Sequence, residues 1–148
     1  LECINDVEKL PKLRQLDCQN NRLTTLSWPG VDGAGIAACT ALEELYLACN
    51  AIMTLDGIPR NCPLSTVDLS TNGVESLEGA GELKKLSELW MTSSQIKSFE
   101  QLACLSQLPL ECLYLEHSPI AEDFEYRKRV TTLIPSLEQL DATAVNRN

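Results

Sequence analysis

The chain has 148 residues, of which 44% are hydrophobic, and its net charge is −9. This length suits one domain with its own core, and the hydrophobic fraction is too high for a disordered chain. The negative charge argues against a nucleic-acid partner, and no apolar run approaches the roughly 18 residues of a membrane-spanning helix. We therefore expect a soluble protein whose partner is another protein, with neither nucleic acid nor membrane involved.

A spacing at the very beginning of the chain recurs further along it. Leu1 lies twelve residues before Leu13, as Ile52 lies twelve residues before Leu64. Leu1 therefore fits a late position in a repeating unit. The sequence predicts a chain that starts mid-repeat and belongs to a longer protein whose earlier repeats are absent here, because terminal repeats need capping.

From residue 13 on, the chain repeats the pattern L-x-x-L-x-L-x-x-N-x-L, where x is any residue. Five units match it, at residues 13–23, 42–52, 64–74, 86–96 and 110–120, and a partial sixth has Leu137 and Leu140. This spacing is typical of the leucine-rich repeat, whose period is about 20–29 residues. The sequence predicts a right-handed α/β solenoid with short parallel strands on its concave face, 3-10 or helical segments on its convex face, and a C-terminal helical cap.

An asparagine follows the strand in the first three units, at Asn21, Asn50 and Asn72. A buried amide needs hydrogen-bond partners, and backbone groups of adjacent turns can supply them. We predict that these three residues form a structural ladder of turns and have no catalytic role. Ser94 and Ser118 stand at the same place in the next two units, and their shorter side chains are expected to break the ladder.

An insertion of seven residues separates the first two units. Pro29, Gly30, Gly33 and Gly35 predict a loop there. The segment GAGIAA fits a dinucleotide-binding glycine pattern, but that pattern must follow a strand and open a helix. Because a Pro-Gly turn precedes it here, we expect no nucleotide site.

The end of the chain departs from the repeat, which divides it into repeats at 1–118 and a cap at 119–148. The segment AEDFEYRKRVTTLI predicts a helix whose buried face has Tyr126, Val130, Leu133 and Ile134. Acidic residues at 122 and 123 favour its start, and Pro135 ends it.

The spacing of the charged residues on this helix predicts their partners. Glu125 and Arg129 are four residues apart, so we expect them to pair. The basic run 127–129 is expected to be a solvated face of the cap.

Few residues suggest catalysis or metal binding. The seven cysteines are scattered, odd in number and without C-x-x-C, which favours reduced thiols over disulfides or a zinc site. The one histidine, His117, has no nearby nucleophile and is expected at the surface. We therefore expect no enzymatic activity, no cofactor and no metal.

The outward side chains of the strands are the candidate binding site. Alternate residues of a strand face opposite sides, so Leu45 and Leu47 point inward and Tyr46 outward. The outward positions of the five units are Gln15, Asp17 and Gln19; Glu44, Tyr46 and Ala48; Thr66, Asp68 and Ser70; Glu88, Trp90 and Thr92; and Cys112, Tyr114 and Glu116. Exposed aromatic residues among acids have the composition of a binding hot spot, and this predicts a protein-binding concave face.

Two stretches indicate a specific family within the leucine-rich-repeat class. They are LSELWMTSSQI at 86–96 and LECLYLEHSPIAEDFEYRKRVTTLIPSLEQLDATAV at 110–145. In its 22-residue repeats, its Trp-Met strand and its cap, the chain resembles the leucine-rich-repeat regulatory subunit of protein phosphatase 1. The resemblance implies a nuclear and cytoplasmic protein that binds the phosphatase catalytic subunit through its concave face. The implied contact residues are Glu44, Tyr46, Asp68, Glu88, Trp90 and Tyr114.

Other adaptors of the same repeat class remain open alternatives. The outer-arm dynein light chain would bind a motor or microtubule, but it tends to have its own N-terminal helix. The spliceosomal A-prime protein pairs with an RNA-binding partner, but it lacks the Glu-x-Trp strand found here at residues 88–90.

Overall fold

The computed structural model describes residue 4 and residues 6–26 and 35–146. Leu1 and the predicted loop residues Pro29, Gly30 and Gly33 lie outside this part of the chain. The elements, in chain order, are η1 (Val7–Lys9), β1 (Gln15–Asp17), η2 (Gly35–Ala38), β2 (Glu44–Tyr46), β3 (Thr66–Asp68), η3 (Ala80–Glu82), β4 (Glu88–Trp90), η4 (Phe99–Leu105), β5 (Cys112–Tyr114), η5 (Pro119–Glu122), α1 (Tyr126–Leu133), β6 (Gln139–Leu140) and β7 (Thr143–Ala144), where η marks a 3-10 helix.

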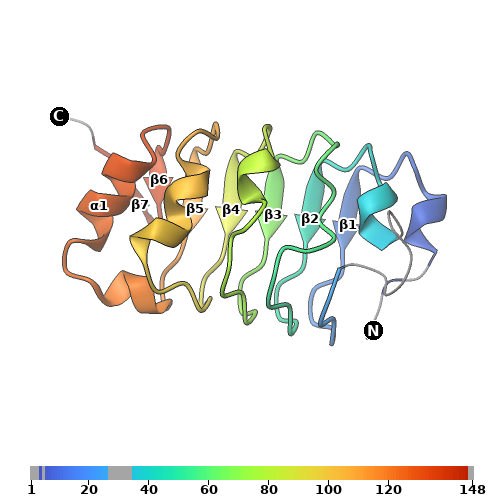
Figure 1. Ribbon diagram of the computed structural model, residues 1–148, viewed down its shortest axis with the longest axis horizontal. Helices are drawn as coiled ribbons and strands as arrows, with labels where there is room; N and C mark the ends of the chain where they lie inside the picture. Colours follow the sequence, from blue (N-terminus) through green and yellow to red (C-terminus); the bar gives the residue numbers. More distant parts are fainter. Residues whose placement is uncertain (1–3, 5, 27–34, 147–148) are drawn as a thin grey trace.

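The strands form one sheet in which neighbours in sequence are neighbours in space, from β1 to β7. They stand side by side along the long axis of the molecule, with α1 at the far end from β1 (Figure 1). Strands β1 to β6 are parallel and in a constant register that aligns Leu16, Leu45, Val67, Leu89 and Leu113. The prediction of a leucine-rich-repeat solenoid is confirmed.

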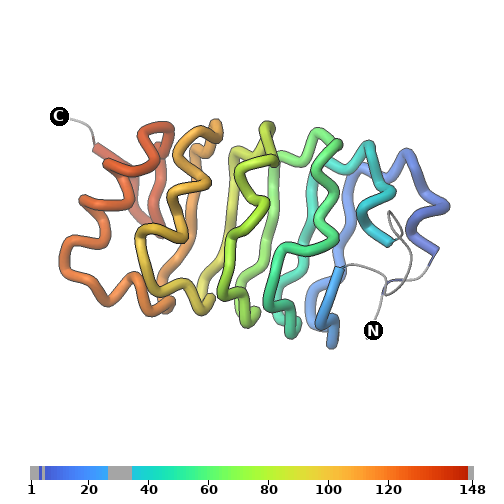
Figure 2. Tube along the Cα trace, in the orientation of Figure 1, coloured from blue at the N-terminus to red at the C-terminus, as the bar shows by residue number. Residues whose placement is uncertain are grey.

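The core lies between the sheet and the returning segments, which run along the other side of the strands (Figure 2). The inward residues of β2 to β5 are almost completely buried, as are the leucines that open each of these repeats. Cys18 and Met91 occupy leucine positions and are buried as well. No repeat has enough apolar surface to be stable alone, so each depends on the neighbour that covers it.

The turn asparagines join successive repeats through their amides. Asn72 accepts the N–H of Ile52 at 3.0 Å, and it donates to two backbone carbonyls at 3.0 Å, one in its own repeat and one in the preceding repeat. Asn50 makes the corresponding bonds one repeat earlier. Asn21 donates to carbonyls of its own turn. Asn50 and Asn72 thus link adjacent turns.

Serines continue the side-chain contacts between turns by a different arrangement. The Oγ atoms of Ser94 and Ser118 lie 2.8 Å apart, and the N–H of Ser94 donates to Oγ of Ser118 at 3.0 Å. Both serines are buried. The prediction that the serines break the ladder is therefore wrong for the turns of Ser94 and Ser118, because two short side chains on adjacent turns reach each other. The amide bonds of Asn72 lie within its own turn or reach the preceding repeat, and the next turn is joined to it through the backbone, where the N–H of Gln95 donates to the carbonyl of Val74 at 2.8 Å.

Each turn also places one residue in the left-handed backbone region, directly before the asparagine or serine. These residues are Asn20, Cys49, Thr71, Ser93 and His117, with φ between 54° and 62°. A β-branched side chain is strained there, whereas asparagine tolerates the conformation. Thr71 is the one β-branched residue of this set, and its side chain is exposed.

We therefore expect Thr71→Asn to raise the free energy of unfolding by about 0.5–1 kcal/mol. Urea denaturation followed by circular dichroism measures the change. Thr24→Asn is the matched control, because Thr24 is also exposed but lies outside the left-handed region. Equal effects of the two substitutions would show that the threonine at 71 is not strained.

The cap helix is shorter than the sequence predicts. Residues 119–122 form η5, and α1 begins only at Tyr126. Asp123 is extended, and its Oδ1 accepts the N–H of Glu125 at 2.8 Å. This bond gives the backbone an alternative to the helix and delays its start. The predicted face is otherwise present: Tyr126, Val130 and Ile134 are buried.

The basic residues of the cap have specific contacts. Arg127 donates to the carbonyls of Leu140, Thr143 and Ala144, at 3.1, 3.1 and 2.6 Å. It thereby holds the antiparallel β6–β7 hairpin against α1, so the prediction of a purely solvated basic run is wrong.

The expected pairing of Arg129 is wrong as well. Its ion pair is with Asp123, at 3.7 Å, and Glu125 pairs with Lys128 instead. The guanidinium of Arg129 also lies 3.7 Å from the centroid of the Phe99 ring. This ring belongs to η4, a contact that spacing within one helix cannot reveal.

Candidate functional site

The sheet register brings five predicted site residues to the same position on adjacent strands. Asp17, Tyr46, Asp68, Trp90 and Tyr114 are successive Cα partners from β1 to β5. Strands lie about 4.8 Å apart, so this row extends across the concave face like a ladder.

Three of these side chains, Tyr46, Trp90 and Tyr114, form a continuous cluster that we call the aromatic column. The ring centroids of Tyr46 and Trp90 are 6.4 Å apart at 55°, and those of Trp90 and Tyr114 are 6.2 Å apart at 74°. Such tilted and edge-on contacts are favourable. The strands of Tyr46 and Trp90 are two apart, or about 9.6 Å, so these rings lean toward each other across β3. All three side chains are half-buried, with surface left for a partner.

Asp68 lies between Tyr46 and Trp90 in the row and is not available as predicted. Its side chain is buried, with 6% exposed, and its Oδ1 accepts the N–H of Ser70 at 2.9 Å. The two rings close over the short carboxylate. Asp68 therefore supports the turn after β3, and the expectation that it is exposed on the concave face is wrong.

Glu44 and Glu88 remain accessible beside the aromatic column. They lie two residues before Tyr46 and Trp90, in register with Thr66 between them, and both are half-buried. Oε2 of Glu44 accepts the hydroxyl of Tyr46 at 2.8 Å, which fixes this carboxylate. None of the outward positions predicted for the five units, from Gln15 to Glu116, is a lysine or an arginine. The concave face is consequently negative and suited to a basic partner.

The contact with Glu44 changes the acidity of Tyr46. The hydrogen bond to Glu44, with burial and the nearby carboxylates, raises the pKa of Tyr46 from 10.0 to about 12. The phenol ionises earlier in the unfolded chain. The stability that Tyr46 contributes is therefore complete below pH 10 and is lost as the pH rises to about 12.

Glu44→Gln should lower the pKa of Tyr46 toward 10.0, because a neutral amide replaces the carboxylate and its N–H can donate to the tyrosinate. The measurement is an ultraviolet titration of tyrosinate, with Tyr46→Phe to identify the signal. Glu88→Gln is the control, because Glu88 acts only through its charge and should have a smaller effect. Equal effects of the two glutamines would contradict the assigned hydrogen bond.

A hollow of about 210 Å³ lies next to the aromatic column, lined by Ser70, Trp90, Thr92 and Tyr114. The indole N–H of Trp90 is buried and has no hydrogen-bond acceptor among the described residues. Burial raises the pKa of the Cys112 thiol, on the adjacent strand, although the indole N–H is close enough to lower that pKa in part. The ring of Trp90 is thus held mainly by packing, between the hollow and the two tyrosines. The hollow has room for one side chain of a partner.

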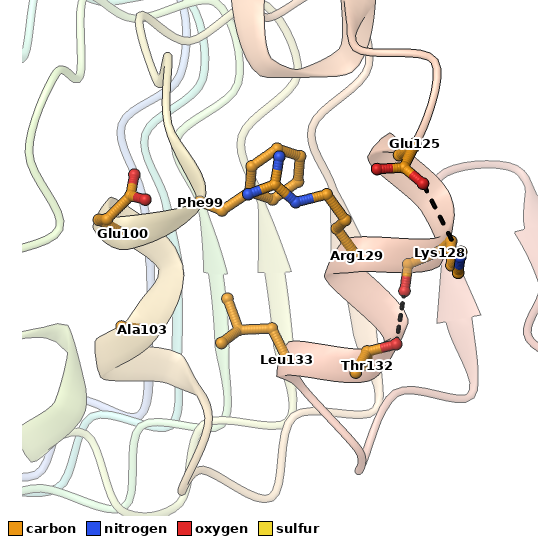
Figure 3. A pocket seen from close by; sticks show the side chains of 8 residues that line it. All are labelled: Phe99, Glu100, Ala103, Glu125, Lys128, Arg129, Thr132 and Leu133. Atoms are coloured by element: carbon orange, nitrogen blue, oxygen red, sulfur yellow. Dashed lines mark hydrogen bonds and ion pairs between the residues drawn. The ribbon is translucent and has the colours of Figure 1, made fainter.

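A larger groove of about 700 Å³ lies between η4 and α1, away from the concave face (Figure 3). Arg129 crosses it to reach Phe99, while Leu133 and Ala103 lie further along (Figure 3). Its acidic and basic residues, Glu100 and Glu125 with Lys128 and Arg129, balance in charge. The groove is the boundary where the cap helix meets the last convex segment.

The described residues show no other chemical site. They contain no group of three or more residues that could hold a metal ion, and their six cysteines are free. His117 is exposed, in the left-handed position of its turn. No described helix is long and apolar enough to cross a membrane.

Gln139 also belongs to the site, although the sequence did not predict it. The partial sixth unit places this residue outward on β6, as the Cα partner of Cys112. Its Nε2 donates to the hydroxyl of Tyr114 at 2.5 Å, so it contacts the aromatic column. The sequence signal for Gln139 is its place directly before Leu140, because alternation along a strand turns it outward when Leu140 points inward.

Comparison with known proteins adds family information. Residues 11–60 match the family model "Leucine Rich repeats (2 copies)". The chain is 37% identical over 75 residues to the protein phosphatase 1 regulatory subunit pprA of Dictyostelium discoideum, a match to 51% of this chain and 22% of that protein. It is 30% identical to leucine-rich repeat-containing protein 23 of Bos taurus, over 93% of this chain and 46% of that protein. The chain thus spans less than half of either relative.

Among solved structures, the Drosophila melanogaster SNF/U2A' complex contains a chain with the same fold. The TM-score is 0.73 at 21% identity, over 90% of this chain and 75% of that chain. At this identity the similarity concerns the fold alone.

Proposed function

This chain is a leucine-rich-repeat solenoid, and from that premise we propose that it is a non-catalytic regulatory subunit which binds the catalytic subunit of protein phosphatase 1 through its concave face. The observation that carries the proposal is the aromatic column beside Glu44 and Glu88, on a face whose described outward positions have no basic residue. The similarity to the phosphatase 1 regulatory subunit pprA supports the choice of partner.

The proposed mechanism is recognition without chemistry. Trp90 and Tyr114 supply apolar area, and the hollow beside them accepts one side chain of the phosphatase. Glu44 and Glu88 pair with lysine or arginine on the partner and accelerate the encounter. Binding one state of the phosphatase more tightly than another shifts its population and so regulates it. We place this activity in the nucleus and cytoplasm.

The direct test is binding of the purified chain to immobilised phosphatase 1 catalytic subunit, measured at several salt concentrations. We expect saturable binding whose association rate falls as salt increases, because charge steers the encounter. Glu88→Lys should slow association, whereas Glu100→Lys, a charge reversal at an exposed position of η4, should not. No binding by the wild-type chain, or equal effects of the two reversals, would contradict the proposal.

An adaptor role in another assembly is the alternative. It is favoured by one observation: leucine-rich repeat-containing protein 23 of Bos taurus is among the relatives that match 93% of the chain, whereas the phosphatase regulator matches 51%. Purification of the natural full-length protein from cells distinguishes the two. Co-elution of spliceosomal or microtubule-associated proteins without phosphatase 1 would support the alternative.

A further inference from the structure

We infer that Gln139 is a positioning residue of the concave site, which holds the ring of Tyr114 against Trp90 and thereby makes the C-terminal cap part of the binding surface. The consequence for phosphatase binding rests on the proposed function, whereas the positioning of the ring does not. Gln139 lies on β6, outside the five repeat strands that supply the other site residues.

The amide of Gln139 has two acceptors that fix its direction. Its Nε2 donates to the hydroxyl of Tyr114 at 2.5 Å and to the backbone carbonyl of Asp141 at 3.0 Å. The hydroxyl of Tyr114, the atom furthest from the backbone, is therefore held in place by Gln139. This contact fixes the orientation of the whole ring. A free tyrosine on an open sheet face would occupy several rotamers instead.

Asp141 is itself held from both sides of the cap. Its Oδ1 accepts the N–H groups of Leu115 and Glu116, at 2.8 and 3.0 Å, directly after β5. Its Oδ2 accepts the hydroxyl of Tyr126, a buried residue of α1, at 3.0 Å. Burial raises the pKa of Tyr126, as does the charge of Asp141, so this hydroxyl remains a donor at neutral pH.

A continuous series of contacts therefore runs from the cap helix to the concave face. It passes from Tyr126 through Asp141 and Gln139 to Tyr114, and from there by ring contact to Trp90. Because edge-on ring packing depends on ring orientation, a change at Gln139 should be felt at Trp90. The cap would then set the shape of the binding site as well as close the core.

The first experiment measures the position of the ring without any partner. Trp28 is the other tryptophan of the chain, so Trp28→Phe leaves Trp90 as the sole fluorescent reporter. In that background, Gln139→Met removes the polar end of the side chain at nearly constant size. We expect acrylamide to quench Trp90 more strongly, because Tyr114 no longer covers its edge.

Two controls make this result specific. Gln15 is an exposed glutamine in the same row of Cα partners as Gln139, at the opposite end of the sheet. Gln15→Met should therefore leave the quenching unchanged. Tyr114→Phe removes the hydroxyl that Gln139 contacts. In the Tyr114→Phe background, Gln139→Met should have no further effect. Unchanged quenching in Gln139→Met, or additive effects of the two substitutions, would overturn the inference.

The second experiment repeats the cycle with immobilised phosphatase 1 catalytic subunit. Gln139→Met should weaken binding by about three- to tenfold, the effect of losing one hydrogen bond, and the loss should vanish in the Tyr114→Phe background. An unaltered affinity would overturn the part of the inference that concerns the partner. If the wild-type chain does not bind, the proposed function fails while the quenching result still decides the role of Gln139.

Discussion

Replacing Trp90 by alanine should weaken binding of the phosphatase 1 catalytic subunit by about 2 kcal/mol or more, which is roughly thirtyfold in Kd. Trp90 is at the centre of the aromatic column and lines the hollow beside it. Alanine removes its own contact area and also the support of Tyr46 and Tyr114. A large, half-buried aromatic residue surrounded by acids is the kind of group that dominates an interface.

The control for the loss of an aromatic ring is Phe124→Ala, since Phe124 is 97% exposed and precedes the cap helix, outside the concave face. Its affinity should match that of wild type. Trp90→Phe should retain more affinity than Trp90→Ala, because phenylalanine keeps an aromatic ring between Tyr46 and Tyr114. Surface plasmon resonance gives the affinities, and denaturation shows that each variant is folded. An alanine variant that binds like wild type would remove Trp90 from the site.

The strands and their register could be predicted because the repeat is almost periodic. In each unit the alternation of two buried residues around one outward residue marks the strand, as in Leu45, Tyr46 and Leu47. The strands stay in constant register although the units differ in length, because the extra residues lie in the segments between strands. The row that contains Tyr46, Trp90 and Tyr114 can therefore be predicted from the alignment of the repeats alone.

The accessibility of individual side chains could not be predicted in this way. Asp68 faces outward like its neighbours, but it is shorter than the aromatic residues on either side, and they close over it. Facing outward is a property of the strand, whereas exposure depends on what the adjacent strands carry. The sequence therefore places Asp68 on the correct face but wrongly predicts that it is exposed.

Contacts between distant segments were missed for a related reason. Arg129 has a suitable acid four residues away, yet it pairs with Asp123 and lies over Phe99 of η4. Gln139 reaches Tyr114 across two strands that are 25 residues apart in the chain. Local spacing carries no information about such partners, which appear only once the cap is packed against the last repeat.

The turn ladder gives the largest expected effect on stability. Asn72→Ala should lower the free energy of unfolding by about 3 kcal/mol or more, because it leaves the N–H of Ile52 and two carbonyls without their side-chain partner. Each buried polar group left unpaired costs about 1–3 kcal/mol. Asn72 is 5% exposed, so water cannot replace the amide without opening the turn. Urea denaturation of the variant and wild type measures the loss.

A serine in the same repeat supplies the comparison that interprets this loss. Ser76→Ala removes an exposed hydroxyl that accepts one turn N–H, and it should cost less than about 1 kcal/mol. Asn72→Ser should be nearly as damaging as Asn72→Ala, although serine occupies the equivalent position in the next two repeats. There Ser94 and Ser118 contact each other, whereas a serine at 72 would lie between Asn50 and Ser94, and its single hydroxyl cannot replace the three bonds of the amide. A stable Asn72→Ser variant would mean that one hydroxyl suffices at this turn and that the three amide bonds of Asn72 contribute little to stability.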